Sequence, residues 1–192
     1  FSNDGVLREG SSHYQFLIAQ RFEQVYLIAR HAGDRLIEQY LHEWISLMRS
    51  ACELFLVPIS SSQYVFPLIG DISPDCPPSW LMPAGNCDKL VKLFGDGSSA
   101  LLARDVQFPR IRQIQDYLRV DLDSLTCFWK TATVHNGVRY HSHHDTGSFI
   151  LYYKGDEIFT DPGSLAYTRE GMLDISSSSH TSVRINELGP FC

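Results

Sequence analysis

The chain has 192 residues, of which 44% are hydrophobic, and a net charge of −6. This composition excludes a disordered chain and indicates a globular protein with room for one good-sized core or two small ones. Acidic residues outnumber basic ones without any basic stripe, which argues against a nucleic-acid partner, and no apolar run is long enough to span a membrane.

The N-terminal part of the sequence predicts a helical hairpin. Ser11 or Ser12 is a good N-cap for a helix over residues 13–32, in which apolar residues recur at helical spacing. The pair Gly33-Asp34 ends this helix and caps a second amphipathic helix over residues 36–55.

Both ends of the chain are expected to be cut from a longer protein. The chain begins FSNDG, without Met and without a signal peptide, and it ends NELGPFC within a strand-and-turn pattern. Two helices with broad apolar faces also cannot bury those faces against each other alone. We therefore expect further sequence upstream.

A long connector is expected after the hairpin. Residues 57–98 are rich in Pro, Gly, Ser and Asp, and a connector of this length is functional or packed on the surface. Short helices are expected around residues 87–94 and around residues 110–118.

Beyond the connector the pattern becomes that of β-strands. Residues 125–134 contain a strand-like run, and residues 148–154 and 157–161 predict a hairpin around a turn at Gly155-Asp156. Residues 181–186 alternate as a further strand. Helices first and strands later indicate the α+β class, with two segregated layers or two domains.

A cluster of histidines is the most informative chemical feature. The run His141-Ser142-His143-His144-Asp145 places three histidines and an aspartate within five residues, and Asp161 and His180 follow. Imidazole and carboxylate groups suit zinc or a similar divalent ion, and a histidine without metal could act as a base near neutral pH. Taken alone, His13 and His180 have the pattern of surface histidines, but three histidines in four residues favour a functional site.

One family with an H-x-H-x-D motif fits poorly. Metallo-β-lactamases have a further histidine directly after the aspartate, where this chain has Thr146. Their βαβ context is also absent, because a hairpin follows the motif here.

A more extensive resemblance is to the heparinase II/III-like polysaccharide lyases. Their β domain carries an H-x-H-x-D segment, a Ser-Phe strand, a short turn and a strand that ends in Asp-x-Gly. This chain has HSHHD, GSFILYYKG and DEIFTDPGSLAY, and SSSSHTSVRIN corresponds to the family's later His-headed strand. The helical domain of the family carries Asp-Gly, then E-x-S-x-x-Y, and later Gly-Asp. Here Asp4-Gly5, the run from Glu9 to Tyr14, and Gly70-Asp71 correspond.

The resemblance implies an α+β multidomain fold, with part of an incomplete (α/α) toroid followed by an antiparallel β-sandwich domain. The toroid would end within residues 1–72, a connector and the start of the β domain would occupy residues 73–123, and the sandwich residues 124–192. The implied activity is that of a carbon–oxygen lyase that cleaves an acidic, uronate-containing polysaccharide by β-elimination. A periplasmic or extracellular location is implied, with the cytoplasm as the alternative.

Position by position, the resemblance implies that Tyr14 is the catalytic acid, with a further role as base, and that His141 is the catalytic histidine. A structural divalent metal, zinc in the first instance, would be held by His143, Asp161 and His180. Removing a weakly acidic proton beside a carboxylate needs a positioned base and a stabilised intermediate, and leaving-group departure needs an acid. Residues expected to orient the loop or contact sugar are Glu9, Asp145 and Arg169.

Two other functions stay open at this point. A family member without lyase activity would bind glycans or assist surface-polysaccharide assembly, while it keeps the metal-stapled β domain. A metal-dependent hydrolase would instead place His141, His143 and Asp145 on one ion. The family's group that neutralises the substrate carboxylate lies on an upstream helix and is not expected within this chain.

Overall fold

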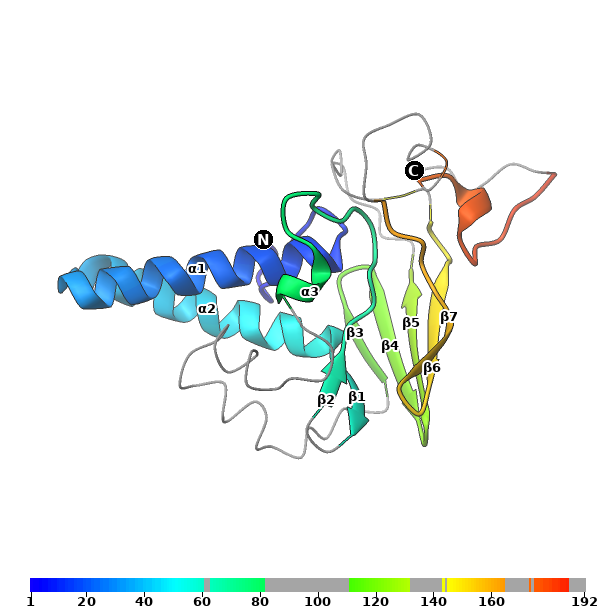
Figure 1. Ribbon diagram of the computed structural model, residues 1–192, viewed down its shortest axis with the longest axis horizontal. Helices are drawn as coiled ribbons and strands as arrows, with labels where there is room; N and C mark the ends of the chain where they lie inside the picture. Colours follow the sequence, from blue (N-terminus) through cyan, green and yellow to red (C-terminus); the bar gives the residue numbers. More distant parts are fainter. Residues whose placement is uncertain are drawn as a thin grey trace.

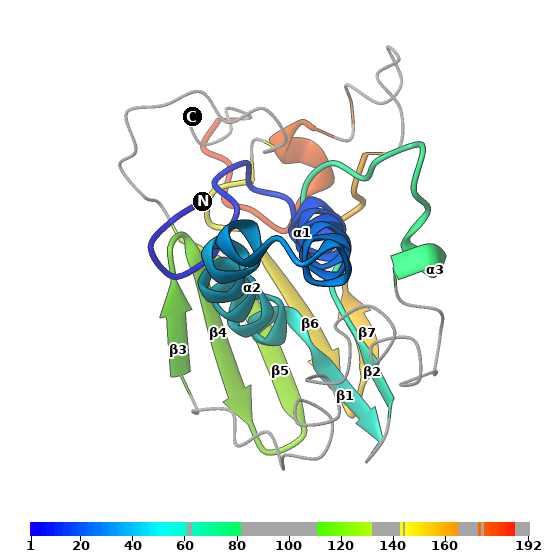
Figure 2. The same cartoon turned by 90° about the vertical axis from the view of Figure 1, so that its left-hand side faces the viewer.

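The computed structural model describes residues 1–60, 63–81, 111–131, 143, 145–164, 173 and 175–186. A helical hairpin extends from one face of an antiparallel five-stranded sheet, and a short two-stranded sheet lies beside their junction (Figure 1). Seen along the helices, α1 and α2 stand over the middle of the sheet (Figure 2). Helices followed by an antiparallel sheet confirm the predicted α+β class.

The helical hairpin forms as predicted from its caps. Helix α1 spans Ser12–Ala32 and begins at Ser11, whose hydroxyl accepts a hydrogen bond from the Tyr14 amide. Gly33 ends it in the left-handed conformation, with φ of 73°. Helix α2 spans Arg35–Phe55, and the Asp34 side chain caps its first turn.

Part of the hairpin surface is apolar and exposed. The exposed large side chains on the two helices include Val25, Ile28, Leu36, Ile37 and Tyr40. The described residues leave these side chains without a covering layer.

The connector contains elements that the sequence did not predict. Strands β1 (Val57–Ser60) and β2 (Gln63–Val65) pair as an antiparallel hairpin, and helix α3 (Pro78–Leu81) is a single turn. The helix expected at residues 87–94 lies outside the described residues.

The helix predicted for residues 110–118 is wrong, because two strands occupy this stretch. Strand β3 (Ile111–Ile114) pairs with β4 (Tyr117–Leu122) across a turn at Gln115 and Asp116. Ile111, Ile114 and Leu118 have helical spacing, but Gln115 has a φ of 54°, which ends any helix there. Pairing with the rest of the sheet therefore overrode the local pattern.

The remaining strands continue the sheet in chain order. Strands β5 (Leu125–Lys130), β6 (Phe149–Tyr153) and β7 (Asp156–Phe159) complete the antiparallel order β3-β4-β5-β6-β7. The predicted β6–β7 hairpin is confirmed, but its turn residues are Lys154 and Gly155, with φ of 53° and 86°, rather than Gly155 and Asp156. A Cβ at position 155 would lie 2.9 Å from the backbone of Ile59, so glycine is also required sterically.

Both faces of the sheet carry apolar side chains. Its inner face packs Tyr117 and Phe128 against Phe55 at the end of α2, and all three are buried. The outer face carries partly exposed apolar side chains on three neighbouring strands: Leu118, Val120, Leu125, Cys127, Trp129, Phe149, Leu151 and Tyr153. A sheet with apolar side chains on both faces is typical of one layer in a larger packed structure, which supports the predicted β-sandwich.

A buried arginine joins the helical hairpin to the sheet. Arg119 on β4 donates hydrogen bonds to the carbonyl oxygens of Leu54 and Leu56, at 2.7 and 2.6 Å, where α2 ends. The Asp121 carboxylate receives two more, at 2.8 and 2.9 Å. The guanidinium group therefore satisfies helix-end carbonyls that would otherwise be buried without donors.

The predicted strand over residues 181–186 is wrong. This stretch follows the 3-10 helix η2 (Ser177–Ser179) as turn and coil, with only an isolated bridge residue. The Phe149 amide donates to the Thr181 hydroxyl at 2.9 Å, so a side chain rather than a strand ladder fastens the segment to the sheet.

Candidate metal centre and active site

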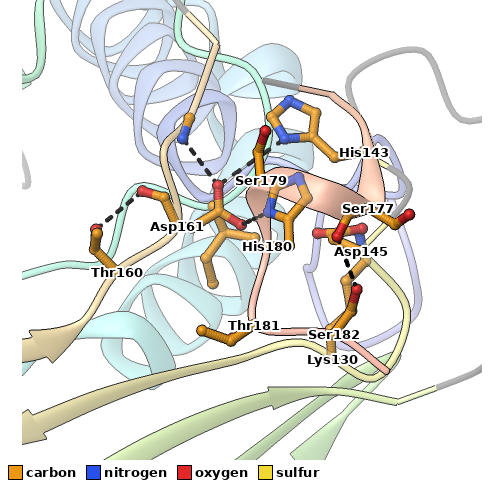
Figure 3. A network of polar contacts seen from close by, with 12 residues as sticks. Lys130, His143, Asp145, Thr160, Asp161, Ser177, Ser179, His180, Thr181 and Ser182 are labelled. Atoms are coloured by element: carbon orange, nitrogen blue, oxygen red, sulfur yellow. Dashed lines mark hydrogen bonds and ion pairs between the residues drawn. The ribbon is translucent and has the colours of Figure 1, made fainter. Parts of the chain in front are cut away.

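Two histidines and an aspartate from three separate segments meet in the interior. His143, Asp161 and His180 each offer a ligand atom, and these atoms all lie within 4.8 Å of one another (Figure 3). His180 Nδ1 is 3.1 Å from one carboxylate oxygen of Asp161, and His143 Nδ1 is 3.9 Å from the other. All three residues are buried.

Local backbone structure places Asp161 and His180. Asp161 follows β7, and its carboxylate accepts a hydrogen bond from the Gly163 amide at 2.9 Å. Gly163 has a φ of 62°, and a Cβ there would lie 2.6 Å from Ile72, which explains the glycine of the Asp-x-Gly sequence. His180 directly follows η2, and Thr181 holds it beside β6.

The donor set and spacing fit a divalent metal. Tetrahedral zinc with bonds of about 2.0–2.2 Å separates its ligand atoms by roughly 3.4 Å, close to the contacts of Asp161 with the two histidines. His180 Nε2 is also buried and has no hydrogen-bond partner among the described residues. Imidazole, carboxylate and imidazole suit zinc and its neighbours among the divalent ions.

The carboxylates around His180 stabilise positive charge at this place. Burial lowers the pKa of His180, but its hydrogen bond to Asp161 and the charges of Asp161 and Asp145 outweigh that effect, so the pKa is raised. The site is therefore electrostatically prepared for a cation, either a proton or a metal ion.

A second carboxylate stands behind His143. Its Nε2 lies 3.0 Å from a carboxylate oxygen of Asp71, which comes from the connector after β2. Because a carboxylate accepts hydrogen bonds, the proton belongs on Nε2, and Nδ1 then presents its lone pair towards Asp161 and His180. This arrangement matches the carboxylate–histidine pairs found behind metal ions.

A buried ion pair lies next to the three candidate ligands. Lys130 at the end of β5 contacts the Asp145 carboxylate, and both side chains are almost wholly buried. The Ser148 amide donates to the Asp145 carbonyl at 2.8 Å, which fixes the turn that leads into β6. Asp145 is therefore paired with Lys130. Among the described residues, His143 lies together with Asp161 and His180 as a candidate ligand group, and Asp145 is not part of that group.

The start of α1 is fastened to the same region. Ser11 Oγ donates to the carbonyl of Asp71 at 2.7 Å, and the Ser12 amide donates to Ile69 at 3.0 Å. Tyr117 on β4 donates through its hydroxyl to the carbonyl of Gly10 at 2.9 Å. Burial, followed by the charges of Asp145 and Asp161, raises the pKa of Tyr117 well above its usual value, so the phenol remains a donor.

His13 was expected on the surface, and this prediction is wrong. The side chain is fully buried, with Nε2 2.7 Å from the carbonyl of Cys76 and Nδ1 accepting from the Ser73 amide at 3.3 Å. Both ring nitrogens are used by the connector, so His13 is a neutral structural residue. His180 is likewise buried, although its sequence pattern taken alone is that of a surface histidine.

Two of the four remaining predicted site residues lie among the described residues. Tyr14 lies half-buried in the first turn of α1, and Glu9 lies half-buried in the turn before this helix. His141 and Arg169 lie outside the described residues.

Sequence reasoning missed two residues beside the candidate ligands. Asp71 belongs to the Gly-Asp pair of the family resemblance, and that pair gives no sign of the contact with His143. Lys130 was not noticed, although it shares the inward face of β5 with Thr126 and Phe128. A lysine at an inward position of a strand signals a buried ion pair, and this could have been found.

The comparisons agree with the resemblance. Residues 105–190 match the family model described as heparinase II/III-like, C-terminal, so the predicted resemblance is confirmed for that region. A search of curated proteins gave no match. Among the described residues, no helix is long and apolar enough to cross a membrane.

Solved structures with a similar fold cover almost the whole chain. Heparan sulfate lyase HepC from Pedobacter heparinus matches with a TM-score of 0.70 and 15% identity over 98% of this chain. A heparinase III with methylated lysines matches with a TM-score of 0.68 and 20% identity, also over 98%. The chain spans 31% and 30% of these two structures, and at such identity the likeness concerns the fold.

Proposed function

We propose that this chain, whose residues 105–190 are a heparinase II/III-like C-terminal region, is part of a polysaccharide lyase that cleaves a uronate-containing glycan by β-elimination. One observation carries the proposal. The buried group of His143, Asp161 and His180 is hydrogen-bonded, through Asp71, to the segment that holds the start of α1, where Tyr14 lies. These hydrogen bonds connect the candidate metal-binding group to the backbone of the helix start that carries Tyr14, which supports a shared site at the junction of helices and sheet.

The proposed chemistry follows from the acidity of the substrate. A base removes the proton on the carbon beside the uronate carboxyl group, the glycosidic oxygen leaves with a proton, and an unsaturated sugar remains. Tyr14 is proposed as the acid that protonates the leaving oxygen, with a further role as base. His141 is proposed as the catalytic histidine that shares the proton transfers.

The proposed metal is zinc, held by His143, Asp161 and His180. When bound, it supplies a fixed double positive charge that joins three loop segments. Asp145 and Lys130 would hold the segment from which the histidine motif emerges. In this proposal the ion has a structural task, and proton transfer belongs to side chains of the protein.

The proposed substrate class is an acidic polysaccharide. The name of HepC, a heparan sulfate lyase, supports this class through a shared fold. Glu9 is proposed to orient Tyr14 or contact sugar hydroxyls, and Arg169 to face an anionic sugar. The candidate glycans are heparan-type, alginate-type and bacterial exopolysaccharide substrates.

The full-length protein should be incubated with a panel of uronate polysaccharides and with neutral dextran. We expect ultraviolet absorbance from the conjugated double bond with at least one acidic glycan and none with dextran. New reducing ends without this absorbance would point to a hydrolase. Glycan binding without any product, while metal remains bound, would replace the proposal with the non-catalytic glycan-binding function.

A further inference from the structure

Asp71 contacts three parts of the fold: the ring of His143, the start of α1 and the segment after Asp161. It lies in the connector between the helical hairpin and the five-stranded sheet, 72 residues before His143 in the sequence, and it is buried. It is not one of the three residues that converge as candidate ligands.

The side chain of Asp71 contacts the imidazole ring of His143. Its carboxylate lies 3.0 Å from His143 Nε2, and both side chains are buried. The only consistent donor in this contact is the Nε2–H group, so Nδ1 is left deprotonated on the side of Asp161 and His180. The carboxylate therefore selects both the ring orientation and the tautomer that a metal requires.

The main chain at Asp71 makes two further contacts, one with the start of α1 and one with the segment after Asp161. Its carbonyl oxygen accepts a hydrogen bond from Ser11 Oγ at 2.7 Å, while Ser11 Oγ itself accepts from the Tyr14 amide at 3.1 Å. Asp71 also forms a parallel bridge with Ser164, and the next amide, that of Ile72, donates to the Ser164 carbonyl at 2.8 Å. Ser164 lies three residues after Asp161.

We propose that Asp71 is a positioning residue that orients His143 for the metal and couples metal binding to the first turn of α1. The coupling runs through two hydrogen bonds, from Asp71 to Ser11 and from Ser11 to the Tyr14 amide. Because coupling between two sites is reciprocal, order at the helix start also strengthens metal binding. This inference rests on the proposed metal site and is independent of the proposed lyase reaction.

Zinc affinity provides the first test. The full-length protein and its Asp71→Asn and Asp71→Ala variants are titrated with zinc against a chromophoric chelator. Removing a carboxylate behind a metal-ligating histidine weakens binding about 10–100-fold, which is expected for Asp71→Ala. Asp71→Asn should lose less, because its amide oxygen still accepts from Nε2. Asp123→Asn, on the exposed β4–β5 turn, removes the same charge and should leave the affinity unchanged.

Hydrogen exchange at the Tyr14 amide provides the second test. In the wild-type protein, zinc should slow this exchange, and in Asp71→Ala it should not, whereas Asp71→Asn should restore part of the protection. Zinc affinities of both Asp71 variants within twofold of wild type would overturn the orienting role. Equal Tyr14 protection with and without zinc in the wild type would overturn the coupling, even if Asp71→Ala failed to fold. Neither measurement contains a glycan, so absence of lyase activity has no effect on either result.

Discussion

Lys130 and Asp145 form an ion pair whose two side chains are almost completely removed from solvent, with exposed fractions of 5% and 0%. Breaking such a pair by removing one partner leaves an uncompensated buried charge. The pair lies beside the candidate metal ligands, so it connects the stability of the sheet to the geometry of the site (Figure 3).

Replacing Lys130 with Met should lower the free energy of unfolding by about 3–5 kcal/mol, because Asp145 then keeps its charge without a partner. The double variant Lys130→Met/Asp145→Asn should recover a large part of this loss, since the remaining group is neutral. Urea unfolding of the wild type, the double variant and both single variants, Lys130→Met and Asp145→Asn, measures both effects. A double variant that is as unstable as the sum of the single variants would show that the pair is not coupled.

Arg119 should be similarly sensitive. Arg119→Met leaves two helix-end carbonyls without their donor and removes the two hydrogen bonds from Arg119 to Asp121, so we expect a loss of at least about 3 kcal/mol in unfolding free energy. Arg112→Met, on the neighbouring strand β3 and partly exposed, should change it by less than about 0.5 kcal/mol. Comparable losses for the two variants would contradict the bridging role of Arg119.

His13 should make stability depend on pH. Burial, partly offset by the hydrogen bond to Cys76, lowers its pKa from the ordinary value of 6.5. The unfolded chain therefore binds a proton at a pH where the folded protein does not, and stability contributed by neutral His13 is lost as the pH falls below 6.5.

The measurement is unfolding free energy between neutral and mildly acidic pH for wild type, His13→Gln and His42→Gln. The wild type and His42→Gln, which alters an exposed histidine, should lose stability in parallel. His13→Gln should have a shallower dependence. Identical slopes in all three proteins would rule out His13 as the titrating group.

Zinc should raise thermal stability through His180. A ligand present at 100 times its dissociation constant stabilises the folded state by about 2.7 kcal/mol, and this should appear as a higher Tm. His180→Ala should abolish most of the zinc-dependent rise, whereas His42→Ala should retain it. A full rise in His180→Ala would mean that the metal binds elsewhere.

The helical hairpin and the β6–β7 hairpin could be predicted because local signals determine them. Ser11, Gly33 and Asp34 act on their own helix ends, and Lys154-Gly155 forms a two-residue turn. Strand β3 and the start of β4 could not be distinguished from a helix by local pattern, because the pairing of β4 with both β3 and β5 decides the outcome.

The three candidate metal ligands could be named from the resemblance, and the structure brings them together. Asp71 could not be assigned, because only the tertiary path of the connector carries it to His143. The expected strand after His180 failed for a similar reason: a hydrogen bond between Thr181 and Phe149 fastens this segment without strand pairing.

In the proposed lyase reaction, Tyr14 carries the proton transfer to the leaving oxygen. The most direct measurement is the rate of unsaturated product formation by the full-length protein, its Tyr14→Phe variant and a Tyr40→Phe control on the exposed face of α2, all loaded with zinc. General acid–base catalysis contributes about 10²–10⁴-fold, so Tyr14→Phe should slow product formation by that factor while Tyr40→Phe matches wild type. Unchanged product formation by Tyr14→Phe, with zinc still bound, would show that Tyr14 is not the catalytic acid.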